Sequence, residues 1–118
     1  MYKLIILIEP EIDEEAFFAG WPRFLEYAEN LPGLVRLVTA PVHGHLVGAY
    51  HPLMVHELIF DSQQTLENAL SSADGVAAGE TLQSITGGAV SLLIAAHLED
   101  SGDNLRSCRN KTLPNSKG

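Results

Sequence analysis

Four of the five histidines lie close together in the chain, at His43, His45, His51 and His56. Imidazole exchanges protons near neutral pH and is also a common ligand of transition metals. His43 and His45 are two residues apart, so both rings would face the same side of an extended segment. The segment is rich in glycine and proline, however, and holds no cysteine or fixed third ligand. We therefore predict solvated loop histidines and no metal site.

His56 and Glu57 are neighbours in an apolar run, so in a β-strand their side chains point to opposite faces. One of the two must enter a covered interior, where a titratable group needs a partner and usually has a shifted pKa. Acid–base catalysis uses shifted pKa values, so His56, Glu57 and His43 are the candidate catalytic residues. The structural alternative is a hydrogen bond or an ion pair, for example with Arg36 on the neighbouring strand.

Aromatic side chains repeat every three or four residues before position 30 and would line one face of a helix. Together with two later residues they would suit an apolar or aromatic ligand with a few polar anchors. The candidate substrate-binding residues are Phe17, Trp21, Phe24, Tyr27, Tyr50 and Met54. Ordinary packing of the helix against a core explains the same pattern. The sequence has no Ser-His-Asp elbow and no phosphate-binding glycine loop.

The charge of the chain excludes two classes of partner. Residues 1–100 hold 14 acidic side chains and only three basic ones, which are Lys3, Arg23 and Arg36. Nucleic acids and anionic membranes are bound through Lys and Arg, so we expect neither as a partner. The apolar run Leu4–Ile8 is too short for a signal peptide or a membrane span, so we expect a cytoplasmic protein.

The elements that must position these candidates form one domain, expected over residues 1–100. Hydrophobic periodicity predicts strands over 2–8, 34–42, 53–60 and 89–97. A first helix is expected from Asp13 to about residue 30, with a kink or a restart near Trp21 because Pro22 removes a donor. A second helical region is expected from 65 to about 85, with a break at 71–75.

The order βαββαβ is that of the ferredoxin-like α+β fold, with a four-stranded antiparallel sheet. The polar segment 101–118 follows the domain, has no periodicity and reads as a disordered tail. It contains the only cysteine, Cys108, so no internal disulfide can form and a nucleophilic role is not expected.

The expected strands carry apolar residues on both faces. In the third strand, Leu53, Val55 and Ile59 share one face, while Met54 and Leu58 share the other. Helices cover only one face of such a sheet, so the other would leave an exposed apolar patch of the size that marks an interface. We therefore predict a homodimer in which two sheets meet face to face across a twofold axis.

Several short motifs carry a likeness to a known family. They are Leu31-Pro32-Gly33-Leu34 after the aromatic helix, the run 56–62 leading into Leu66, Ala69 and Leu70, Asp74-Gly75, and Thr86-Gly87-Gly88. With them, residues 2–98 resemble the EthD family of the dimeric α/β-barrel superfamily. The resemblance implies a ferredoxin-like protomer, a dimeric α/β barrel and a pocket between sheet and helices. Relatives often carry a histidine about eight residues before the proline of the LPGL turn, where this chain has Phe24.

Two function classes follow from the resemblance. The first is a small-molecule enzyme without a cofactor, of oxygenase, isomerase or lyase type, that acts on a hydrophobic organic compound. The second is a non-catalytic dimeric ligand-binding or stress-responsive module. Haem binding, known in the superfamily, is a third reading, although the sequence places no axial histidine. An enzyme should gather titratable groups at a cavity, whereas a binding module can have an apolar or closed one.

Overall fold

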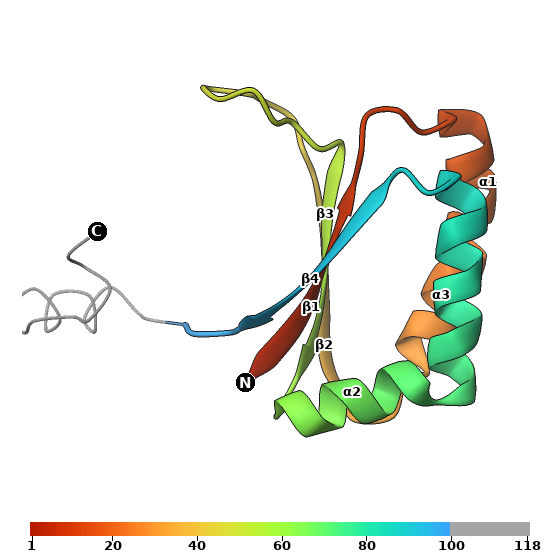
Figure 1. Cartoon of the computed structure of the whole chain (residues 1–118), viewed down its shortest axis with the longest axis vertical. Coiled ribbons are helices and arrows are strands. Elements are labelled where there is room, and N and C mark those ends of the chain that lie inside the picture. The colour runs from red at the N-terminus through yellow and green to blue at the C-terminus, as the bar shows by residue number, and fades with distance from the viewer. Residues whose placement is uncertain (100–118) are drawn as a thin grey trace, which may run out of the picture.

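The computed structural model describes residues 1–99 of the chain (Figure 1). Its elements are β1 (Tyr2–Ile8), α1 (Glu14–Glu29), β2 (Leu34–Pro41), β3 (Met54–Phe60), α2 (Gln63–Ser71), α3 (Ala73–Thr86) and β4 (Val90–Ala96). The predicted order of strands and helices is confirmed. The tail predicted at 101–118, with Cys108, lies outside the described residues. No helix within residues 1–99 is long and apolar enough to cross a membrane.

The four strands form one antiparallel sheet in the order β2-β3-β1-β4. All three helices lie on one side of this sheet (Figure 1). The core fills the space between sheet and helices, where Ile6, Ile8, Phe17, Phe24 and Phe60 are almost fully buried. The architecture is the predicted ferredoxin-like α+β fold.

Helix α1 begins at a good cap and runs without a break. The side chain of Asp13 accepts a hydrogen bond from the backbone N–H of Ala16, and Glu14 and Glu15 lie at the positive end of the helix dipole. The expected restart near Trp21 does not occur, because α1 continues through Pro22 to Glu29. Pro22 has no N–H to donate to the carbonyl one turn earlier in the helix. Pro22 is exposed, so this carbonyl lies on the side of α1 where water can reach it.

Strand β2 contains a bulge that changes the expected alternation. The register shifts between Leu34 and Arg36, so Val35 has no partner residue on β3. Simple alternation would put Val35 on the same face as Leu37 and Thr39. Val35 is instead about half exposed, and Leu34 packs on the core in its place. The bulge follows the turn at Gly33, which has a positive φ of 79°.

A close contact at the α2–α3 junction gives a test of the fold. A Cβ added to Gly75 would lie 2.1 Å from the carbonyl oxygen of Ala69 and 2.6 Å from that of Leu70. Since both are backbone atoms that cannot easily move aside, Gly75→Ala should lower the free energy of unfolding by roughly 2 kcal/mol, measured by urea denaturation. Gly79→Ala on the same helix meets nothing within 4 Å and should instead gain up to about 1 kcal/mol of helix propensity. Equal effects of the two substitutions would contradict this packing.

Candidate functional site

His56 is a fully buried polar side chain on the helix-covered face of the central strand β3. Its Nδ1 atom lies 2.8 Å from the Oγ1 atom of Thr39, the residue directly opposite on β2. Its Nε2 atom is also buried and has no hydrogen-bond partner among residues 1–99. One ring nitrogen is therefore fixed by the neighbouring strand, and the other is left to bind something else.

Two aromatic rings of α1, those of Trp21 and Phe24, contact this imidazole, and Phe17 extends their row. Phe17, Trp21 and Phe24 form a row, with ring centroids 5.0 Å and 4.9 Å apart in succession. Trp21 and Phe24 each meet the His56 ring at a steep angle, with centroid distances of 5.0 Å and 5.7 Å. The helical spacing of three and four residues brings all three rings to the same face of α1.

The enclosure changes the protonation of His56. Burial lowers the pKa of its imidazole to about 4, while the charge of Glu57 and a backbone interaction with Val38 act in the opposite direction. Desolvation dominates because a charged ring among aromatic side chains loses its hydration without gaining an anionic partner at contact distance. The imidazole is therefore neutral at neutral pH.

Two cavities lie near the helix-covered face of the sheet, and His56 itself lines neither of them. The larger has a volume of about 190 Å³ and is lined by apolar side chains that include Ile8, Phe17 and Met54, with Glu14 as its charged residue. The smaller, about 60 Å³, is lined by apolar side chains that include Phe24 and Leu58. Met54, which lines the larger cavity, and Leu58, which lines the smaller one, flank His56 on the same face of β3, so each cavity adjoins a neighbour of the imidazole.

Glu57 points to the other face of the sheet, which we call the open face. It consists of the outward side chains of the four strands: Lys3, Ile5, Leu7, Arg36, Val38, Ala40, Val55, Glu57, Ile59, Ser91, Leu93 and Ala95. The carboxylate of Glu57 accepts a hydrogen bond of 2.9 Å from the Nζ atom of Lys3. Glu57 is therefore on the opposite side of the sheet from the imidazole of His56.

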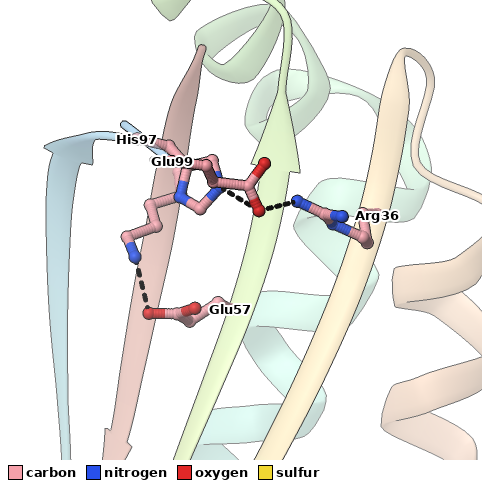
Figure 2. A network of polar contacts seen from close by, with 5 residues as sticks. Arg36, Glu57, His97 and Glu99 are labelled. Atoms are coloured by element: carbon pink, nitrogen blue, oxygen red, sulfur yellow. Dashed lines mark hydrogen bonds and ion pairs between the residues drawn. The ribbon is translucent and has the colours of Figure 1, made fainter. Parts of the chain in front are cut away.

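The sequence had suggested Arg36 as an ion-pair partner on the neighbouring strand, but Arg36 does not pair with Glu57. Its Nη2 atom donates to the Oε1 atom of Glu99 at 2.6 Å, and His97 Nε2 lies 3.4 Å from the same oxygen (Figure 2). The hydrogen bond from Arg36, followed by its charge, lowers the pKa of Glu99. The bulge at Val35 and the return of the chain after β4 bring these partners together, and neither can be read from strand alternation.

The remaining histidines lie far from His56 in the segment 42–53, which we call the arm. His43, His45 and His51 line one open hollow beside Pro10, and the rings of His45 and His51 are 4.1 Å apart. Within residues 1–99, no group of three or more potential ligands is arranged to hold a metal ion. His43 is thus not brought together with His56 or Glu57.

Of the other candidate binding residues, some line the larger cavity and some lie away from it. Met54 is buried beside the larger cavity, with Phe17 of the aromatic row. Tyr27 packs at the margin of the core, and Tyr50 is exposed and donates a hydrogen bond to Glu9. Sequence reasoning missed Thr39, the partner of His56; its position opposite a polar residue on the next strand becomes visible only when the register is known.

Comparison with known proteins identifies the fold. No protein-family model and no curated protein matches the chain. An ethyl tert-butyl ether degradation (EthD) family protein from Bacillus halodurans C-125 has a similar structure, with a TM-score of 0.75 and 24% identity over 83% of this chain and 99% of that chain.

Two further structures are similar at lower identity. A dimeric ferredoxin-like protein of unknown function from Jannaschia sp. CCS1 gives a TM-score of 0.63 with 14% identity, covering 81% of this chain and 98% of that chain. SnoaB, a cofactor-independent oxygenase from Streptomyces nogalater, gives 0.57 with 11% identity, covering 86% of this chain and 95% of that chain. At these identities the likeness establishes the fold, and the ferredoxin-like fold implied by the EthD resemblance is confirmed.

Proposed function

We propose that this protein binds a small hydrophobic organic compound between its sheet and its helices, with His56 as the polar group that contacts the compound. The observation that carries the proposal is the buried Nε2 atom of His56, which has no partner among the described residues. A buried polar atom without a hydrogen bond costs roughly 1–3 kcal/mol of stability. Such a group calls for an explanation, and a functional contact is one that also accounts for its aromatic surroundings.

The environment of His56 defines the ligand chemically. At His56 a charged ligand would lose its hydration among Trp21, Phe24 and the aliphatic side chains without meeting an opposite charge, since Glu14 of the larger cavity is exposed to solvent, so the ligand is neutral. One hydroxyl, carbonyl or ether oxygen suffices to pair with Nε2. The larger cavity of about 190 Å³ suits a compound of about one ring, since a cavity of roughly 150 Å³ holds benzene.

A panel of three neutral probes tests this proposal. Phenol and anisole carry an oxygen, whereas toluene has a similar shape and none. Wild-type protein should bind phenol about fivefold more tightly than toluene, because one added hydrogen bond to a buried group contributes about 1 kcal/mol. Anisole only accepts hydrogen bonds, so it should also bind more tightly than toluene if Nε2 carries the proton. Calorimetry gives the affinities, and the ¹⁵N shift of Nε2 reports the contact.

The control removes the polar pair and keeps the shape. In His56→Leu/Thr39→Val, both partners of the 2.8 Å contact are replaced together, so no hydroxyl is left unpaired. The three probes should bind this variant equally. Equal binding of phenol and toluene to the wild-type protein would refute the role of His56.

Catalysis on such a compound is the second candidate function. It is favoured by a neutral imidazole with one free nitrogen, which can take a proton from a bound substrate. An oxygenase, isomerase or lyase without a cofactor would use His56 in this way, since Glu57 lies on the other face of the sheet and His43 lies in the arm. Substrate turnover that is lost in His56→Leu/Thr39→Val while the variant stays folded would favour an enzyme over a binding module.

We also propose that the protein works as a homodimer joined through its open face. The face is largely aliphatic, and its two cations are both paired, Lys3 with Glu57 and Arg36 with Glu99. These cations are two of the three basic residues among residues 1–99, which hold 13 acidic ones. The open face is therefore close to neutral in an acidic protein, so a second copy meets the least repulsion there. The cytoplasmic location stays a prediction.

A further inference from the structure

The arm, residues 42–53, projects from the end of the sheet between β2 and β3. Its base is closed by backbone hydrogen bonds from Val42 N to Leu53 O (2.9 Å) and from Leu53 N to Ile8 O (2.7 Å). The contact between the rings of His45 and His51 joins its two limbs. Figure 1 shows the arm extending to the side of the sheet away from the helices, which is the side of the open face.

The tip of the arm is apolar and bare. Leu46 is 100% exposed and Val47 is 89% exposed, so neither packs on another part of residues 1–99. Isolated exposed aliphatic side chains are common, but two consecutive ones at the end of a projecting segment form a contact element without a partner. No surface within residues 1–99 covers the tip, because Leu46 touches none there.

Charge identifies the kind of partner. The arm has no Asp, Glu, Lys or Arg in its twelve residues, whereas residues 1–99 together hold 13 acidic and three basic side chains. A basic protein would be recognised through carboxylates and an acidic surface through Lys or Arg, and the arm offers neither. A second copy of this chain presents an aliphatic, charge-compensated surface on the same side, so it complements the arm.

We propose that the arm is a clasp: in the dimer, Leu46 and Val47 of each subunit pack against the second copy of the chain at the margin of its open face. This inference rests on the proposed face-to-face homodimer and adds to it a second, separate contact. Twofold symmetry makes the contact occur twice in each dimer, so each subunit contacts its partner through its own arm and is contacted by the arm of the partner.

The test compares dimer dissociation constants by analytical ultracentrifugation. Leu46→Ser/Val47→Ser should raise the dissociation constant at least tenfold, because each dimer loses four buried aliphatic side chains. Val76→Ser is the matched control, since Val76 is exposed (51%) on α3 on the other side of the molecule and should leave the constant unchanged. Isotope-filtered NOE spectra of mixed labelled and unlabelled subunits should show contacts from the Leu46 and Val47 methyl groups to the partner.

Each outcome separates the two proposals. If the wild-type protein is a dimer and the arm variant dissociates no more readily than the control, the clasp is wrong and the homodimer stands. If the wild-type protein is a monomer at micromolar concentration, both are wrong. Binding of the monomer to neutral phosphatidylcholine vesicles, lost in Leu46→Ser/Val47→Ser, would assign the tip to a lipid surface and overturn the clasp.

Discussion

Acidification from pH 6.5 to pH 4 should remove about 3 kcal/mol of folding stability through His56 alone. The pKa of its imidazole is about 4 in the folded protein and 6.5 in the unfolded chain. Between these values the unfolded chain binds a proton that the folded protein does not. The contribution is therefore fully present above pH 6.5, falls as the pH drops towards 4, and is constant below that value.

Urea denaturation at a series of pH values measures this effect. The protein has many carboxylates that also respond to acid, so the informative quantity is the difference between wild-type protein and His56→Leu/Thr39→Val. Between pH 7 and pH 4, the free energy of unfolding of the wild-type protein should fall by about 3 kcal/mol more than that of the variant. Parallel curves for wild-type protein and the double variant would show that His56 is not buried in its neutral form.

The same variant separates stability from function. At pH 7, replacement of a buried hydrogen-bonded pair by apolar side chains of similar shape is close to neutral for stability and can increase it. If the unpaired Nε2 serves a ligand, the variant should be as stable as wild-type protein or more stable, and should no longer distinguish phenol from toluene. A functional polar group is thereby distinguished from one that the fold requires.

Leu93→Asp should convert the proposed dimer into a monomer. Leu93 is 51% exposed on β4, opposite Ile5, and belongs to the open face. Face-to-face packing would bury two new carboxylates per dimer without partners, a cost of several kcal/mol that raises the dissociation constant at least a thousandfold. Sedimentation at micromolar concentration should then give the monomer mass of 12.8 kDa.

Leu92→Asp provides an unusually close control. Leu92 precedes Leu93 on β4 and is equally exposed, at 54%, but it points to the helix side of the sheet. The two variants have the same composition and the same charge. Dissociation by Leu93→Asp alone locates the interface on the open face, whereas dissociation by both would place it along the margin of β4.

Local patterns predicted the elements well because each has its own signal. The spacing of Phe17, Trp21 and Phe24 predicted the row of rings on α1, and the capping residue Asp13 predicted its start. Alternation correctly placed His56 and Glu57 on opposite faces of β3. It could not say which residue faced the helices, because β3 is apolar on both sides.

Long-range partners could not be predicted from such patterns. Thr39 and His56 are 17 residues apart, Lys3 and Glu57 are 54 apart, and Arg36 and Glu99 are 63 apart. Each pair depends on the sheet register, and the bulge at Val35 shifts that register by one residue on β2. Arg36 nevertheless lies on the same face as Glu57, and the two do not pair because Lys3 pairs with Glu57 and Glu99 pairs with Arg36.

Strand β4 is an edge strand of the sheet, so the backbone N–H and C=O groups on its outer side have no strand partner within residues 1–99. Edge strands of natural proteins usually carry charged side chains or proline, which hinder pairing with an edge strand of another molecule. Strand β2 at the opposite margin has both, in Arg36 and Pro41, whereas Val90–Ala96 has neither. Aggregation of concentrated or partly unfolded samples will therefore begin at β4, and a carboxylate introduced there protects the chain against fibre growth.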